Sequence, residues 1–132
     1  NSIKKIYIYE GGVSAGFPSP ADDYLDGDLN LHKHLVKNPA STFFIKVKGS
    51  SMDDAGISDG DILVVDKSLD PKSSDIVLAV INGEFTVKRY INSNGHYLKA
   101  ESSSDIYSDI RLSSDMDFEI WGVVTHTIHS NR

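Results

Sequence analysis

The chain has 132 residues, of which 39% are hydrophobic, 24% are charged and none is cysteine, and its net charge is −6. These values are ordinary for a folded globular domain and argue against disorder, coiled coil and collagen-like repeats, and the lack of cysteine excludes disulfides, thiolate metal sites and cysteine nucleophiles. The acidic balance disfavours direct, sequence-specific DNA binding, and the short apolar runs and missing signal segment lead us to expect a cytoplasmic protein with no membrane segment.

Residues 1–40 are predicted to form an arm, a joint and an extended strap. Residues 3–9 are apolar and aromatic, as in a short strand, and glycines and prolines follow between positions 11 and 20. Glycine provides backbone freedom, and each proline forces the residue before it toward an extended conformation. Asn30 is a suitable cap for a short helix in which Leu31 and Leu35 share one face, and Pro39 should end that helix.

From residue 42 onward, period-two alternation and β-branched runs predict strands. The expected strands are 42–48, 61–66, 76–81, 84–91, 96–100 and 118–128. Asn82-Gly83 and Asn94-Gly95 accept positive φ at both central turn positions, so each should close a tight hairpin. The Ser- and Asp-rich segment 101–117 is expected to be a long loop with room for one edge strand. The sequence therefore predicts a single, mainly β domain.

A glycine-serine turn, Gly49-Ser50-Ser51-Met52, directly follows the strand expected at 42–48. Such a turn places a hydroxyl beside backbone N–H groups, which are the parts of a nucleophile and an oxyanion site. The motif alone is common turn chemistry, so a plain loop is the alternative interpretation.

The Asn82-Gly83 hairpin carries a second unusual feature. Its register places Val77 opposite Lys88, and both faces of the hairpin are apolar, so it should be a central pair of strands. Lys88 would then point toward apolar neighbours, and a desolvated lysine loses its proton more readily, as a general base must. The alternative is that Lys88 packs its stem and keeps its ammonium group in water.

Four ordered motifs resemble one family, the LexA-type self-cleaving Ser-Lys peptidases, and within it the UmuD and MucA type. The motifs are Gly49-Ser50-Ser51-Met52, the stretch Ile57 to Asp66 (ISDGDILVVD), the stretch Gly83 to Arg89 (GEFTVKR), and the stretch Trp121 to His126 (WGVVTH). The resemblance covers about Ala15 to His129. It implies a LexA/UmuD-type peptidase fold with a cleavable arm at 1–15, a strap and short helix at 16–40, and a β-rich peptidase-like region at 41–132.

The resemblance also implies a role for each site residue. Ser51 matches the nucleophile, and Lys88 matches the general base. The backbone amides of Ser50 and Ser51 match the oxyanion site, and Ala15-Gly16 matches the bond that is cut. No cofactor and no metal is implied.

The function implied by the resemblance is SOS mutagenesis. The protein would be an autoproteolytic accessory subunit of an error-prone translesion DNA polymerase. A RecA filament on single-stranded DNA would stimulate its cleavage, and it would act as a homodimer with a UmuC-like Y-family polymerase subunit. The main alternative is the self-cleaving and dimerisation domain of a LexA-type or phage-type repressor. A signal peptidase, which would need a membrane anchor, and a non-catalytic module with relic Ser51 and Lys88 are further alternatives.

Histidines and acidic residues offer weaker alternatives. His32 and His34 lie two residues apart on the short helix and point to different faces, so no metal site is assigned to them. His126 and His129 could suggest a Ser-His-Asp hydrolase, although their alternation gives no clear approach to Ser51. Acidic residues at 22–28 and 59–61 lack the ligand spacing of a calcium loop.

Overall fold

The computed structural model describes residues 7–9, 25–28, 30–104 and 108–132. The chain divides into two compact units, Asn1–Lys37 and Asn38–Arg132. Among the described residues, no helix is long and apolar enough to cross a membrane.

In the first unit, strand β1 (Tyr7–Tyr9) pairs antiparallel with strand β2 (Leu25–Asp28). A strand near Tyr9 was expected from the apolar run, but its partner was not. The sequence of β2, Leu-Asp-Gly-Asp, consists largely of residues that are depleted in strands, so no β pattern marks it. The pairing brings together two segments that lie on either side of Ala15-Gly16 in the sequence.

The short helix α2 (Leu31–Leu35) follows β2 in the chain. The Asn30 side chain accepts a hydrogen bond of 3.1 Å from the Lys33 N–H, which confirms the expected cap. The helix ends before Pro39, which begins the 3-10 segment η1 (Pro39–Ser41) in the second unit.

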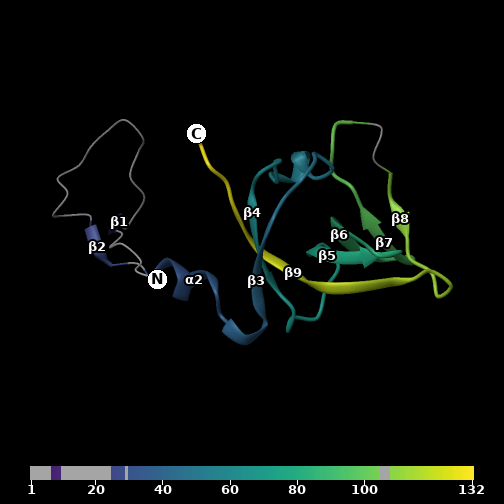
Figure 1. The fold of residues 1–132 in the computed structure, drawn as a ribbon, viewed down its shortest axis with the longest axis horizontal. Coiled ribbons are helices and arrows are strands. Elements are labelled where there is room, and N and C mark those ends of the chain that lie inside the picture. Colours follow the sequence, from purple (N-terminus) through teal and green to yellow (C-terminus); the bar gives the residue numbers. More distant parts are fainter. Residues whose placement is uncertain (1–6, 10–24, 29, 105–107) are drawn as a thin grey trace. The chain divides into compact units, whose positions relative to one another are not determined.

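The second unit contains one seven-stranded antiparallel sheet, which confirms the mainly β fold (Figure 1). Its order is β3-β4-β9-β5-β6-β7-β8. The strands are β3 (Thr42–Lys46), β4 (Ile62–Asp66), β5 (Ile76–Ile81), β6 (Glu84–Asn92), β7 (His96–Lys99), β8 (Ile110–Arg111) and β9 (Phe118–Ile128). β8 occupies the expected edge position within the Ser- and Asp-rich segment.

Both predicted hairpins are present. Asn82 and Gly83 have φ of 49° and 84°, and Asn94 and Gly95 have φ of 52° and 111°. These positive values are the reason why Asn-Gly suits both turns. The first hairpin sets the register of β5 against β6, with Val77 opposite Lys88 as expected.

The long strand β9 joins the two halves of the sheet (Figure 1). Its first part pairs with β5 and its second part pairs with β4, so that Val123 lies opposite both Val77 and Asp66. Val64 and Val65 pair with His126 and Val124, which leaves one extra residue on β9 between these pairs. Such a bulge bends the strand and increases its twist.

Two hydrophobic clusters lie against the sheet, and β5 contributes to both. Val77 and Ala79 belong to one cluster, whereas Leu78 belongs to the other. This alternation explains why both faces of β5 are apolar. The cluster that contains Leu78 also contains Met52, which is 3% exposed and directly follows Ser51.

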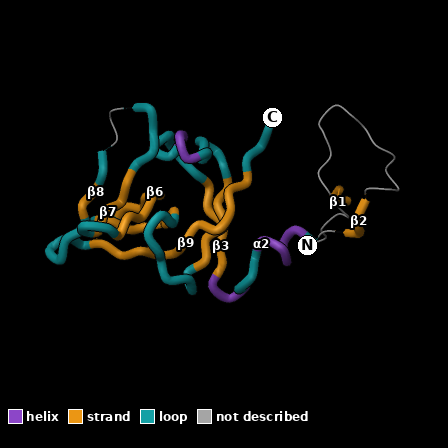
Figure 2. Tube along the Cα trace, turned by 180° about the vertical axis from the view of Figure 1, so that it is seen from behind, coloured by secondary structure: helices purple, strands orange, loops and turns teal. Residues whose placement is uncertain are grey.

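The β3–β4 pair has a 3-10 segment at each end, η1 at one and η2 (Asp53–Ala55) at the other (purple in Figure 2). At the η1 end, the buried carboxylate of Asp66 accepts hydrogen bonds of 2.7 Å from the Asn38 amide and 2.8 Å from the Ser41 hydroxyl. It also accepts bonds of 2.9 Å and 2.7 Å from the backbone N–H and the hydroxyl of Ser68. This network fixes the segment just before β3 to the end of β4.

The first prediction concerns Asp66. Burial opposes its ionisation, but the hydrogen bonds from Asn38, Ser68 and Ser41 outweigh burial and lower its pKa to about 2. Because the folded pKa lies below the unfolded one, this stability is present above about pH 4 and is lost as the pH falls toward 2. Asp66→Asn should therefore lower the free energy of unfolding at pH 7 by roughly 1–3 kcal/mol and flatten its pH dependence below pH 4.

Urea unfolding at several pH values measures both effects. The matched control is Asp70→Asn, which removes the same charge from an exposed position four residues away. If Asp66→Asn kept the wild-type pH dependence, the role of the network would be refuted.

The second prediction concerns Gly122 on β9. A Cβ atom at this position would lie 2.7 Å from Val65 Cγ1 and 3.0 Å from the Asp66 carbonyl oxygen. Because the backbone of β4 cannot move aside freely, Gly122→Ala should cost about 1–3 kcal/mol of stability. Thermal unfolding measures this loss, with Glu119→Ala at an exposed position of the same strand as control. Equal melting temperatures for the two variants would contradict the close approach of β9 to β4.

Candidate active site

The turn that carries Ser51 is held at both of its ends. Gly49 has a φ of 92°, which favours glycine, and its N–H donates a hydrogen bond of 2.8 Å to the Asp59 carboxylate. On the other side of Ser51, the Met52 side chain is buried in the core, and its carbonyl accepts bonds from Ala55 and Ile57 at 3.0 and 3.2 Å. Ser51 therefore lies on a turn whose backbone is fixed before and after it.

Lys88 lies on β6 and is only 8% exposed. Its Nζ is 3.1 Å from Ser51 Oγ, 2.7 Å from Thr86 Oγ1 and 3.3 Å from the Val87 carbonyl oxygen. The side chain is therefore largely buried and its amine is hydrogen-bonded within the protein, which argues against the snorkelling alternative. The fold brings Ser51 and Lys88 together across 37 residues of sequence.

The surroundings of Lys88 favour its neutral form. Burial lowers the pKa of its amine, because the charged form loses its hydration. A neutral amine has two N–H donors and one lone pair. If the donors serve Thr86 and the Val87 carbonyl, the lone pair faces the Ser51 hydroxyl. This arrangement is suited to take a proton from Ser51.

Thr86 is the site residue that sequence reasoning missed. Its hydroxyl makes the shortest of the three contacts to Lys88 Nζ, at 2.7 Å. The signal was present, because residues two apart on a strand lie on the same face. A hydroxyl at position 86 is therefore expected beside a strand lysine at position 88.

An open cavity of about 270 Å³ lies beside Ser51. Its walls are mainly apolar and come from β3, the turn, β5 and β6. They include Ile45, Val47, Met52, Leu78, Phe85 and Val87. The cavity can therefore accept an apolar chain segment next to the Ser51 hydroxyl.

The other predicted positions are placed as follows. Ser50 belongs to the Ser51 turn, and its carbonyl accepts a bond of 3.2 Å from the Asp53 N–H. Ala15 and Gly16 lie outside the described residues. His32 and His34 lie in α2, in the first unit. Among the described residues, no group of three or more His, Cys, Asp or Glu side chains is placed to hold a metal ion.

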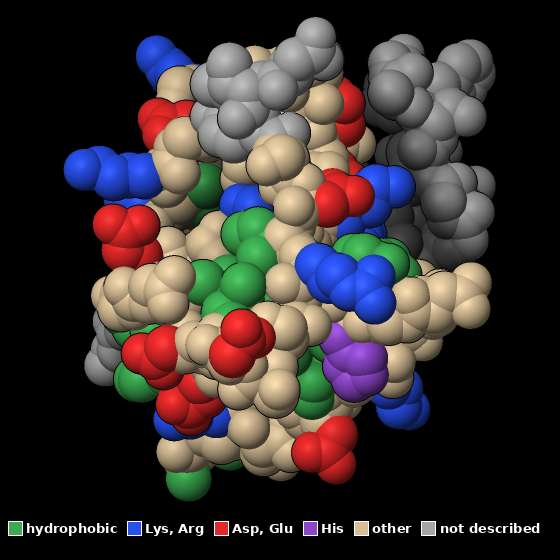
Figure 3. All heavy atoms as spheres, turned by 90° about the vertical axis from the view of Figure 1, so that its right-hand side faces the viewer, with side chains coloured by type: hydrophobic (Ala, Val, Ile, Leu, Met, Phe, Trp, Pro, Cys, Tyr) green, Lys and Arg blue, Asp and Glu red, His purple; other side chains and the backbone are tan. Residues whose placement is uncertain are grey.

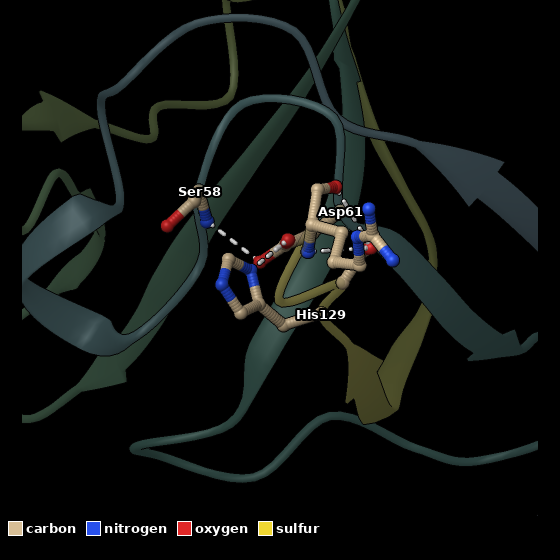
Figure 4. A network of polar contacts seen from close by, with 5 residues as sticks. Ser58, Asp61 and His129 are labelled. Atoms are coloured by element: carbon tan, nitrogen blue, oxygen red, sulfur yellow. Dashed lines mark hydrogen bonds and ion pairs between the residues drawn. The ribbon is translucent and has the colours of Figure 1, made fainter.

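The C-terminal histidines have partners other than Ser51. His129 Nδ1 lies 2.6 Å from the buried Asp61 carboxylate, which also accepts a bond of 2.8 Å from the Ser58 N–H (Figure 4). The Ser58 bond and the contact with His129 together outweigh burial and lower the pKa of Asp61. His126 Nδ1 contacts Thr125 Oγ1 at 3.0 Å. His129 thus contacts Asp61, whereas Ser51 contacts Lys88.

The face of the molecule seen in Figure 3 has acidic and basic side chains interspersed around a small apolar area. A nucleic-acid surface concentrates basic side chains instead. The described side chains on this face therefore form a mixed-charge surface.

Comparison with known proteins gives a consistent result. The profile of the Peptidase S24-like family matches residues 7–125. Protein ImpA of Escherichia coli is 45% identical over 125 residues, which cover 95% of this chain and 84% of ImpA. Protein MucA of Escherichia coli is 43% identical over 128 residues, which cover 96% of this chain and 86% of MucA. The LexA repressor of Pasteurella multocida is 35% identical over 122 residues, which cover 92% of this chain and 57% of LexA.

These matches extend over almost the whole chain and include the segments that carry Ser51 and Lys88. The family match agrees with the mainly β sheet. The predicted resemblance is confirmed, and the chain belongs to the Peptidase S24-like family as a UmuD/MucA-type SOS mutagenesis protein.

Proposed function

We propose that this protein is a self-cleaving serine peptidase in which Ser51 is the nucleophile and Lys88 is its general base. The observation that carries the proposal is the 3.1 Å contact between Lys88 Nζ and Ser51 Oγ at a buried position. Family membership supports the same chemistry, because the matched family is one of peptidases. The proposed substrate is the Ala15-Gly16 bond of the chain itself.

The proposed reaction has two halves. Neutral Lys88 takes the proton of Ser51 while Oγ attacks the carbonyl carbon of Ala15, and the backbone amides of Ser50 and Ser51 stabilise the oxyanion. The Lys88 ammonium then donates its proton to the Gly16 nitrogen as the C–N bond breaks, which leaves an ester between Ala15 and Ser51. Water then attacks the ester carbonyl carbon as Lys88 accepts a proton from it, and the Lys88 ammonium returns this proton to Ser51 Oγ as the ester C–O bond breaks, which frees the Ala15 carboxyl group.

The cavity beside Ser51 supports a peptide substrate. Its apolar walls suit a short extended segment, and small residues at Ala15 and Gly16 allow close approach to the turn. Because the segment belongs to the same chain, it is supplied at a high effective concentration. This lowers the entropic cost of bringing the bond to Ser51.

The biological role that we propose is that of an accessory subunit of an error-prone translesion polymerase in the SOS response. A RecA filament on single-stranded DNA would stimulate cleavage, and the trimmed homodimer would bind a UmuC-like Y-family polymerase subunit. Similarity to ImpA and MucA over most of their length supports this role. The match to a LexA repressor supports the alternative of a repressor domain. Co-purification with a UmuC-like subunit, compared with operator DNA retention by the full natural chain, separates the two roles.

The third prediction concerns the cleavage products. Incubation at alkaline pH or with activated RecA should yield fragments 1–15 and 16–132, read by mass spectrometry. Ser51→Ala should abolish cleavage, because the acyl-enzyme cannot form. Lys88→Ala and Lys88→Arg should each slow it by at least about 100-fold, because the first has no base and the second stays protonated.

Lys99→Ala is the matched control for this experiment, because it removes an exposed lysine from β7. It should cleave at the wild-type rate. Cleavage of Ser51→Ala at the wild-type rate would refute the proposed nucleophile, and a cut at another bond would refute the assignment of Ala15-Gly16.

The fourth prediction concerns pH. Cleavage requires neutral Lys88, so the rate should rise as the pH rises through the pKa of this amine. Burial lowers that pKa, so the rise should begin below the pH at which an ordinary lysine loses its proton. Rates measured from pH 6 to 11, with circular dichroism to confirm folding, test this expectation. A rate independent of pH over this range would refute Lys88 as the base.

A further inference from the structure

Glu101 connects the turn of Ser51 to the strand of Lys88. It lies 50 residues after Ser51, just beyond β7. Its N–H donates a hydrogen bond of 2.9 Å to the Ser51 carbonyl, and its own carbonyl accepts one of 2.9 Å from the Asp54 N–H. The backbone of Glu101 therefore holds the segment 51–54 at two points.

The side chain of Glu101 binds the residue next to Lys88. Its two carboxylate oxygens accept hydrogen bonds of 2.8 Å and 2.9 Å from Nε and Nη2 of Arg89. Arg89 also donates a bond of 2.8 Å from Nη1 to the Ser74 carbonyl. A two-bond contact between guanidinium and carboxylate fixes orientation as well as distance. The side chains of Arg89 and Glu101 are 26% and 24% exposed, respectively, so the pair is partly buried.

The sheet itself does not bring Ser51 close to Lys88. Ser51 follows β3, an edge strand, whereas Lys88 lies on β6, and β4, β9 and β5 lie between them. Small changes in sheet twist would therefore alter the distance between Ser51 Oγ and Lys88 Nζ. The buried Met52 packs the turn into the cluster of Leu78, and a directional connection to β6 would restrain this distance further.

We propose that Arg89 and Glu101 are positioning residues that hold the Ser51 turn against β6 and so set the distance between Ser51 and Lys88. This inference rests on the proposed self-cleavage. A displacement of about 1 Å between reacting groups can cost about 100-fold in rate. The hydrogen bonds of the pair lower the pKa of Glu101 and raise the pKa of Arg89, so the ion pair persists at the alkaline pH at which Lys88 is neutral.

The simplest alternative is an ordinary surface ion pair, whose loss changes stability by about 0–1 kcal/mol and leaves the site intact. The pH profile of cleavage separates the two roles. The midpoint pH of this profile reports how far burial lowers the pKa of Lys88. The plateau rate reports how well Ser51 and Lys88 are aligned. Loss of a positioning residue should lower the plateau rate. General loosening of the fold would instead hydrate Lys88 and raise the midpoint pH.

The experiment measures the cleavage rate of the full chain from pH 6 to 11 for Arg89→Met, Glu101→Gln and the double variant. Each single change should lower the plateau by about 10- to 100-fold without moving the midpoint. The double variant should be no slower than the slower single variant, because both changes break the same connection. Arg111→Met is the matched control. It removes a guanidinium group that lies over the Tyr97 ring at the β8 edge of the sheet. This variant should keep the wild-type pH profile of cleavage.

Three results would overturn the positioning role. These are a plateau within about twofold of wild type in both single variants, a shift of the midpoint without loss of plateau rate, and losses that multiply in the double variant. Wild-type protein that stays intact at alkaline pH would refute the proposed function and the positioning role together. Wild-type cleavage that depends on Ser51, combined with unaffected Arg89 and Glu101 variants, would refute the positioning role alone.

Discussion

The burial of one amine is the constraint on which the site depends. Lys88 is 8% exposed and contacts the oxygens of Ser51, Thr86 and Val87. Placing an ammonium group there costs hydration energy, and the same cost makes the neutral amine accessible. The strand that carries it must therefore be internal, dry and well ordered. The position of β6 between β5 and β7, with Asn82-Gly83 setting its register, meets this requirement.

The rest of the fold places the turn that follows the edge strand β3 close to the internal strand β6. β9 pairs with β4 and β5 and so joins the β3–β4 pair to the strands around Lys88. Met52 anchors the Ser51 turn in the same hydrophobic cluster that receives Leu78 of β5. Packing thus sets the approximate position of Ser51, and directional hydrogen bonds from neighbouring segments refine it.

Local features of this fold were predictable from the sequence, and distant pairings were not. The two Asn-Gly turns, the register of β5 with β6 and the Asn30 cap follow from residue types within a few positions of each other. Periodicity alone did not place Ser51 beside Lys88; only the ordered motifs suggested it. β1 pairs with β2, β9 lies between β4 and β5, and Glu101 contacts the Ser51 turn. Each of these features joins distant segments, so local patterns contain no information on them.

The hydrogen bonds between Asn38, Ser41 and Asp66 fix the point at which the chain enters the sheet. Gly16 precedes this anchor by 22 residues. A fully extended chain of 22 residues spans at most roughly 75 Å, whereas a unit the size of Asn38–Arg132 has a radius of gyration of about 12 Å. For the proposed self-cleavage, chain length therefore permits Ser51 to act on the Ala15-Gly16 bond of its own chain or of a second copy. Under that proposal, protein concentration rather than chain length would set the share of cleavage that occurs between copies.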